Sequence, residues 1–269
     1  MAFVGNSFTF DNISSERYGL FIITKDSKDT VDISDYKSDV IKTNRQSKFH
    51  PLKQTIEKPS EIPISICSET PLSRNQLDQI DSWLFRNDGK FRKLRINQED
   101  MEGYYYNCRL INLSGDTFAN NIHVINAVMQ CDSIYAWANP QTRVINITST
   151  PTNFKFTNIS SEDMLKPVYT IKVGMVYGLL GGEILNNRYI KITDTTTNEY
   201  MELSGLLDNE IIKIDTEHEI ITSDKRTSGV LDLFNKNFMR LSRGKHEFLI
   251  EGDILEFKMM YQNARKIGN

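Results

Sequence analysis

The side chains that most often carry chemistry form no reactive pattern in this chain of 269 residues. Metal sites need several ligands at fixed spacing, as in HxH or HExxH, and the histidines show neither that spacing nor a cluster with cysteine. One of them, His218, lies in a polar stretch typical of a turn, where a solvated ring is expected. The four histidines are His50, His123, His218 and His246. No metal site and no cofactor are therefore predicted.

Motifs for nucleophilic catalysis and phosphate binding are not found in the sequence either. It contains no GxSxG, P-loop or GxGxxG pattern. The glycine-rich segment 178–182 (GLLGG) lacks the Lys-Ser/Thr pair and the following helix that a phosphate cradle needs. This segment is interpreted as a turn between two strands.

Paired carboxylates could hydrolyse a glycosidic bond if two of them faced each other. Glu99 and Asp100 are adjacent, and adjacent residues of a strand point to opposite faces. Glu217 and Glu219 would share a face, but acidic turns often contain such pairs. No catalytic residue is predicted, because no set of nucleophile, base and oxyanion donor is recognisable, and the protein is expected not to be an enzyme.

Sugar binding usually needs an exposed aromatic platform. Both tryptophans, Trp83 and Trp137, lie in the first half of the chain, so the second half offers only tyrosines. Tyrosines packed along strands, with the hydroxyl at the edge, are favoured, and a tyrosine sugar platform remains the alternative. The tyrosines concerned are Tyr169, Tyr177, Tyr189, Tyr200 and Tyr261.

Composition and charge narrow the class of protein. Hydrophobic residues make up 39% of the chain and charged residues 25%, which is typical of a globular protein. The net charge of −3, without a block of lysine and arginine, predicts no nucleic-acid partner. No stretch of about 18 apolar residues occurs, so no membrane insertion is expected.

The cysteines and the opening residues indicate the compartment. Cys67, Cys108 and Cys131 are few, odd in number and without a CxxC pair, which argues against a disulfide framework and a zinc site. The opening MAFVGNSFTFDN lacks a basic segment and a long apolar stretch, so no secretion signal is expected. Synthesis in a reducing cytoplasm is predicted.

The first half of the chain is predicted to contain strands and one helix. Phe8 and Phe10 point the same way along a strand, and the segment 18–24 (YGLFIIT) is expected to pair with it. The polar segment 26–60 is either a solvated loop or an extended arm that pairs with another subunit. A helix near 71–86 follows. It is expected to begin either at Pro71 or at a capping box formed by Ser73 and Gln76.

Further strands complete the expected architecture, which is mainly β. Strands are predicted at 61–67, 91–96, 104–113 and 123–135, the last with a bulge because Val124, Ala127 and Met129 do not alternate strictly. The domains are expected at 1–145 and 146–269, and the second consists of strands at the spacing of a sandwich. Its predicted strands are 153–159, 168–173, 188–193, 199–203, 210–215, 219–222, 229–233, 246–251 and 253–261.

Three stretches of the chain carry an ordered series of motifs. The motifs are Phe8–Phe10, Ser15, Tyr18–Leu20, Trp83-Leu84, Tyr104-Tyr105, Met129–Cys131, Tyr135–Trp137, Ile211–Asp215, Glu219–Ile221, Phe238–Leu241 and Gly244–His246. Together these stretches resemble the distal tail protein family of siphophages. The start resembles the family's Phe-rich strand, turn with Ser and Gly-Leu strand, and the middle resembles its helix ending in Trp-Leu, Tyr-Tyr strand and closing strand. The third stretch resembles its Ile-Asp hairpin and its approach to the last strands.

Two departures accompany this resemblance. His246 stands where the family commonly has Asn, and the segment 26–60 lacks the Arg-Asp-Gly type of turn that many members carry. The resemblance implies an N-terminal β-sandwich or split-barrel-like domain with one helix and an arm, followed by a galectin-like antiparallel β-sandwich. It implies a hexameric ring in the tail tip or baseplate of the virion, joining the tail tube protein to the tip hub and contacting receptor-binding proteins.

Two other functions remain alternatives to the ring. The second domain could be a carbohydrate-binding module for the host cell wall, which glycan binding by residues 150–269 alone would favour. The chain could also be a tail tube protein, which would polymerise into long cylinders where a distal ring would stop. If the segment 26–60 is the arm, deletion of Val40–Lys58 should abolish oligomerisation and leave a folded monomer.

Overall fold

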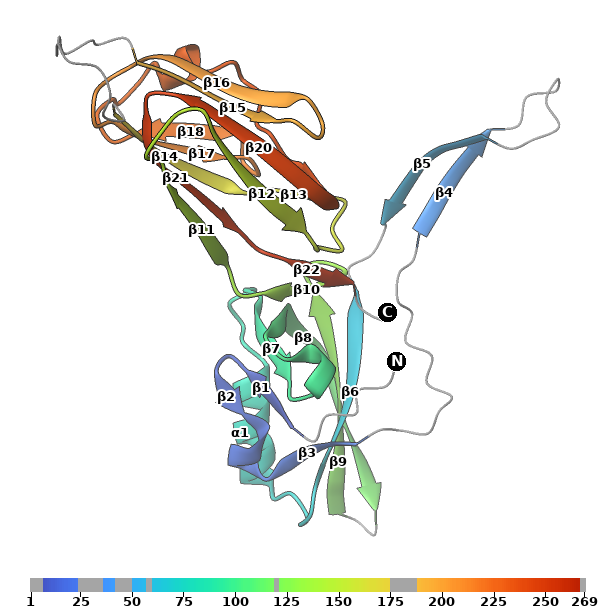
Figure 1. Ribbon diagram of the computed structural model, residues 1–269. Coiled ribbons are helices and arrows are strands. Elements are labelled where there is room, and N and C mark those ends of the chain that lie inside the picture. Colours follow the sequence, from blue (N-terminus) through green and yellow to red (C-terminus); the bar gives the residue numbers. More distant parts are fainter. Residues whose placement is uncertain are drawn as a thin grey trace. The chain divides into compact units, whose positions relative to one another are not determined.

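The computed structural model describes residues 7–23, 36–41, 50–56, 60–118, 121–174 and 188–266 (Figure 1). The chain forms two compact units, the first being Met1–Ala138 with Arg265–Asn269 and the second Asn139–Ala264. Each unit has its own hydrophobic core. The predicted fold class, mainly β with one α-helix near the start, is confirmed. The domain limits 1–145 and 146–269 stay a prediction about which segments fold independently.

One antiparallel sheet organises the first unit. Its strand order is β2-β1-β7-β8-β9-β6-β3, and β10 pairs with β8 and with β22. Alternation explains the packing, since Ile62, Ile64 and Ile66 of β6 all point into the core. The strands are β1 (Phe8–Phe10), β2 (Ile13–Ser14), β3 (Leu20–Ile23), β6 (Glu61–Ser68), β7 (Arg92–Ile96), β8 (Tyr104–Phe118), β9 (Asn121–Cys131), β10 (Tyr135–Ala138) and β22 (Ala264–Lys266).

The helix α1 (Arg74–Leu84) begins at the predicted capping box. The Ser73 side chain accepts from the Gln76 amide, and the Gln76 side chain accepts from the Ser73 amide at 2.9 Å. Trp83 anchors the helix, because its ring stacks on Phe8 with centroids 5.5 Å apart. Its indole N–H donates to the Phe10 carbonyl at 3.0 Å. Both contacts join the helix to β1, so local capping and long-range packing define the same element.

The strand β3 lies at a different place in the sheet from the one predicted. The segment 18–24 was expected to pair with the first strand, but β3 pairs with β6, with Leu20 opposite Ser68. The 3₁₀ helix η1 (Ser15–Tyr18) ends at Gly19, whose φ of 65° is left-handed. This turn separates β3 from β1, which pairs with β2 and β7 instead.

The predicted bulge lies on the partner strand. Buried residues alternate regularly along β9 from Ile125 to Cys131, and Val124 belongs to its half-exposed outer face. The register shifts instead on β8, between Leu110 and Asn112 and again between Asp116 and Thr117. The single strand predicted at 123–135 is also wrong, since β9 ends at Cys131 and β10 starts at Tyr135.

Part of the segment 26–60 forms a separate antiparallel ribbon. The strands β4 (Tyr36–Ile41) and β5 (His50–Ile56) pair with each other, with Tyr36 opposite Ile56. Within the described residues they have no other strand partner. A structureless loop is therefore wrong for these two stretches, while the residues between and around them lie outside the described chain.

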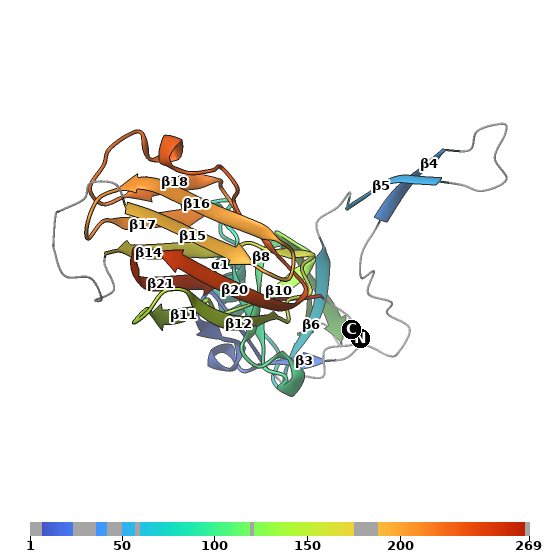
Figure 2. The same ribbon diagram turned by 45° about the horizontal axis from the view of Figure 1, so that its top comes forward.

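The second unit is a β-sandwich. Its five-stranded sheet has the order β11-β21-β14-β17-β18 and its four-stranded sheet the order β12-β20-β15-β16. Figure 2 shows these strands as two layers, and their inward side chains form one cluster. The strands are β11 (Gln141–Asn146), β12 (Thr152–Asn158), β14 (Val168–Val173), β15 (Arg188–Asp194), β16 (Glu199–Leu206), β17 (Ile211–Asp215), β18 (Ile220–Ser223), β20 (Gly244–Gly252) and β21 (Ile254–Tyr261), besides the short pair β13 (Met164–Leu165) and β19 (Leu241–Ser242).

Two predictions for the second unit need correction. Residues 229–233 were expected to be a strand but contain the 3₁₀ helix η3 (Val230–Leu233), which follows Gly229 in a left-handed conformation with φ 77°. β11 was missed because its exposed residues show no alternating pattern. It is nevertheless the edge strand beside β21, with Gln141 opposite Tyr261.

Candidate interaction sites

The histidines whose side chains the structure describes do not lie in a metal-binding cluster. Among the described residues no group of three or more His, Cys, Asp or Glu side chains could hold a metal ion. His218 lies exposed in the turn between β17 and β18, and His123 is half-buried on β9. His50 begins β5, where side chains are not described, and the glycine-rich segment 178–182 lies outside the described residues.

The fourth histidine belongs to a buried pair in the second unit. Nδ1 of His246 lies 2.6 Å from Oδ2 of Asp194, and Nε2 lies 2.7 Å from the Ser242 carbonyl oxygen. Both side chains are 1% exposed. Oxygen atoms thus lie within hydrogen-bond distance of both ring nitrogens. The contact between His246 and Asp194 joins β20 to β15.

A second buried carboxylate fixes the loops at the other side of the sandwich. Glu210 is fully buried and accepts from Ser223 at 2.5 Å, from the Leu207 amide at 2.7 Å and from Arg226 Nε at 3.0 Å. Arg226 also donates to the Gly205 carbonyl at 2.6 Å. Every donor comes from the loops around β17 and β18, so this network holds those loops together.

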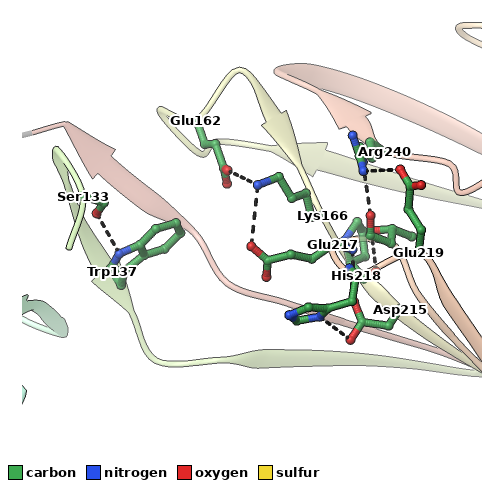
Figure 3. A network of polar contacts seen from close by, with 11 residues as sticks. Ser133, Trp137, Glu162, Lys166, Asp215, Glu217, His218, Glu219 and Arg240 are labelled. Carbon is green, nitrogen blue, oxygen red and sulfur yellow. Dashed lines mark hydrogen bonds and ion pairs between the residues drawn. The ribbon is translucent and has the colours of Figure 1, made fainter. Parts of the chain in front are cut away.

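The carboxylates of the turn 215–219 pair with separate cations rather than with each other (Figure 3). Glu217 lies 3.6 Å from Lys166, and Glu219 lies 2.8 Å from Arg240. Asp215 accepts from the ring of His218 at 3.0 Å. The acidic pair considered for glycoside hydrolysis is thus divided between two ion pairs.

An open groove of about 560 Å³ lies beside the Arg240–Glu219 ion pair. Apolar side chains of Met164, Leu231 and Phe238 line it together with charges of both signs. Lys236 and Glu199 contribute charges that balance each other. No single ligand chemistry follows from this lining.

The tyrosines of the second unit fall into two groups. Tyr169 and Tyr261 are buried, and the Tyr169 hydroxyl donates to the Met239 carbonyl at 3.3 Å. Tyr189 and Tyr200 are 39% and 41% exposed on the outer face of the four-stranded sheet. The packed arrangement holds for the first two, whereas the last two are exposed on adjacent strands. Tyr177 lies outside the described residues.

Two cysteines of the first unit face each other in its core. Cys108 and Cys131 are opposite on β8 and β9, with sulfur atoms 3.4 Å apart. Both are free and fully buried, and burial raises the pKa of the Cys108 thiol well above its ordinary value. Cys67 is a half-buried free thiol.

An acidic turn, Glu99–Glu102, connects β7 and β8. Glu99 and Asp100 lie between the strands, in the 3₁₀ helix η2 (Glu99–Met101). The three carboxylates of Glu99, Asp100 and Glu102 are exposed. Arg265 donates to the Asp100 carbonyl and thereby holds the turn.

A basic hollow of about 220 Å³ lies beside the start of β7. Buried Phe10, Leu84 and Leu110 form its apolar floor, and the half-exposed Phe85 and Ile111 form its walls. The charged residues of its lining are all cations, namely Arg86, Lys90, Arg92 and Arg109. We refer to these nine residues as the basic hollow.

Sequence reasoning missed the basic hollow. Its only local signal is the segment 85–91 (FRNDGKF), in which two aromatic residues flank charged and turn residues directly after a helix. Phe85 follows the helix directly and is 50% exposed. Ile111 is exposed because it is the extra residue of the β8 bulge.

The sequence matches two family profiles in succession. Residues 3–133 match the phage tail protein N-terminal domain, and residues 135–261 match the phage tail C-terminal domain. The chain belongs to this phage tail protein family. The two profiles adjoin each other and include nearly the whole chain, so it is a structural protein of the phage tail or baseplate, in agreement with the resemblance to distal tail proteins.

One solved structure agrees with this assignment at the level of the fold. The Dit protein of phage SPP1, described as a paradigm of the hub adsorption apparatus in phages that infect Gram-positive bacteria, superposes with a TM-score of 0.65 at 9% identity, covering 96% of this chain and 98% of that one. The baseplate of phage p2 gives a TM-score of 0.44 at 11% identity, covering 91% and 90%. No curated protein matches the sequence. Within the described residues, no helix is long and apolar enough to cross a membrane.

Proposed function

We propose that this phage tail protein assembles into a closed ring of six copies that joins the tail tube to the hub of the tail tip. The SPP1 Dit protein, which belongs to a hub adsorption apparatus, has the same two-unit fold over nearly the whole of both chains. A ring of identical subunits needs a head-to-tail interface, in which different surfaces of one subunit meet. The first unit offers surfaces of this kind.

The observation that carries the proposal is the ribbon of β4 and β5. Within the described residues, these strands pair only with each other. A two-stranded ribbon is only marginally stable by itself in water, so it requires further contacts. Its free edges can extend the sheet of a neighbouring subunit by strand addition.

The test removes β5 with the last two residues of β4, so that the ribbon cannot form, and measures the mass in solution. The wild-type chain should give, by light scattering, six times the 31.1 kDa of one copy, and negative stain should show six-fold rings with a central channel. Deletion of Val40–Lys58 should leave a folded monomer. A variant with the same residues replaced by a Gly/Ser segment of equal length controls for chain length and should also be monomeric. A deletion variant that still forms the wild-type ring would contradict the role of the ribbon.

The proposal also covers the partners of the ring, its role and the place where the chain is made. Its partners are the tail tube protein, the tip hub and receptor-binding proteins, and its role is non-enzymatic. The chain is made in the host cytoplasm before assembly into the virion. The cysteines, which are few and include no CxxC pair, favour synthesis in a reducing compartment.

One observation favours sugar binding as a second function of the sandwich. Tyr189 and Tyr200 are exposed on adjacent strands, and Lys191 lies over the Tyr200 ring with Nζ 4.7 Å from its centroid. Aromatic faces next to charged groups are suited to bind sugar rings. The full chain should then bind host cell-wall glycan, and Tyr200→Ala with Tyr189→Ala should abolish that binding while Tyr261→Phe retains it. Equal retention of glycan by all three proteins, or by none, would contradict this function.

A further inference from the structure

The basic hollow combines an apolar floor with an excess of positive charge. Phe85 and Ile111 are 50% and 44% exposed around a volume of about 220 Å³. Sites for drug-sized ligands usually measure about 300–1,000 Å³, so this hollow suits the side chains of a protein segment better. Exposed apolar side chains surrounded by charges are typical of protein contact surfaces.

The cations of the hollow are only partly neutralised. Arg92 pairs with Asp11 at 3.2 Å and also with Asp88. Arg86 lies 3.8 Å from Asp11, and Lys90 takes part in no ion pair among the described residues. Arg109 donates to the neutral side chain of Gln130 at 2.7 Å. The hollow therefore retains positive charge next to exposed apolar surface, which favours an acidic partner.

The first unit carries an acidic surface at the opposite end of the same strand. The acidic turn follows β7 directly, whereas Lys90 and Phe91 precede it. Within the described residues, the carboxylates of Glu99, Asp100 and Glu102 form no ion pair. A strand of five residues at about 3.3 Å each separates the two surfaces by about 16 Å. Lys90 therefore cannot pair with this turn in its own subunit.

We infer that the basic hollow of one copy binds the acidic turn of the next copy. Lys90 and Arg86 pair with the carboxylates of Glu99 and Glu102, while the aliphatic stems of these side chains cover Phe85 and Ile111. The contact joins two different surfaces of identical chains, so it is head-to-tail, as a closed ring requires. This inference rests on the proposed ring and names one of its interfaces.

The test reverses the charge of each surface separately. Arg86→Glu with Lys90→Glu makes the hollow acidic, and Glu99→Lys with Glu102→Lys makes the turn basic. Because like charges then face each other, each variant alone should assemble at least about 100-fold more weakly than the wild type. Arg243→Glu with Lys245→Glu makes the same charge change on exposed residues of the second unit and should leave assembly unchanged.

An equal mixture of the two charge-reversed variants provides the decisive experiment. The acidic hollow of one variant meets the basic turn of the other, and the unchanged surfaces of both also match. Rings of alternating copies should therefore form at wild-type concentration, and a chain carrying all four changes should form rings by itself. Circular dichroism and thermal unfolding of each variant establish that the subunits are folded. Reversed variants that assemble like the wild type, or a mixture that stays dissociated, would overturn the contact while leaving the ring intact.

Zero-length carbodiimide coupling separates failure of the contact from failure of the ring. In a mixture of isotopically light and heavy wild-type chains, an amide between Lys90 and Glu99 or Glu102 should appear in mixed-isotope peptides. Such a product from chains that are monomeric by light scattering would support the contact. It would count against a ring that the chain forms without other tail proteins. Monomeric chains that give no such product would overturn both.

Discussion

The two units differ in the kinds of polar side chains that they bury. Among the described residues, the polar side chains buried in the first unit are all serines, namely Ser7, Ser15 and Ser60. The second unit buries acidic and basic side chains, among them Asp194, Glu210 and His246, each with hydrogen-bond partners. The second unit thus uses charge to hold its own loops and strands together, whereas the first is held by apolar packing and a capped helix. The first unit therefore keeps its charges on the surface, where they are available to partners.

The largest effect is expected from truncating the anchor of the helix. Trp83→Ala removes a side chain that is 2% exposed, together with its stacking on Phe8, and should destabilise the first unit by about 3–5 kcal/mol. Hydrogen exchange should rise throughout α1 and β1 and remain unchanged in the second unit. Trp137→Ala serves as the control, because Trp137 is only half-buried and should cost much less. Equal destabilisation by both variants would contradict the role assigned to the helix anchor.

A somewhat smaller effect is expected from removing the cation of the buried network. Arg226→Ala leaves the carboxylate of Glu210 buried without its counter-charge, which should cost about 3 kcal/mol in the second unit. The midpoint of urea unfolding, followed by exchange in the loops around β17 and β18, measures this change. Lys155→Ala breaks an ion pair that is exposed on both sides and should change the midpoint little. If the two variants behaved alike, the buried network would not be what stabilises those loops.

The smallest effect concerns pH. Partial burial raises the pKa of the Asp215 carboxyl, but donation by the amides of His218 and Glu217 and by the His218 ring outweighs burial and lowers it. A lowered pKa means that this carboxylate contributes stability above the ordinary Asp pKa of about 3.9, and that the contribution is lost as the pH falls through the lowered value. Asp215→Asn should therefore lower the unfolding midpoint slightly at pH 7 and remove this part of the acid dependence. An acid unfolding curve identical to that of the wild type would show that the turn does not depend on the charge.

Local sequence patterns were sufficient for many elements, and the errors have a common cause. The capping box of Ser73 and Gln76 was readable because all of its hydrogen bonds lie within one turn. The strand that pairs with β3 could not be predicted from the sequence. The choice between β1 and β6 depends on a left-handed turn at Gly19 and on strands far away in the chain. Residues 229–233 show strand-like residue types, yet Gly229 in a left-handed conformation leads into η3.

The sequence by itself determined the class of this protein: a mainly β chain, one capped helix, and the order of motifs that places it among phage tail proteins. These features follow from residue spacing, because alternation and capping act over a few neighbouring residues. Only the tertiary structure decided which charges are buried as pairs and which stay at the surface. Glu210 and Glu99 are both acidic residues near turns, and they differ only in what packs around them. Exposure is a property of the assembled fold, so the basic hollow and the acidic turn became visible only once the strands were in place.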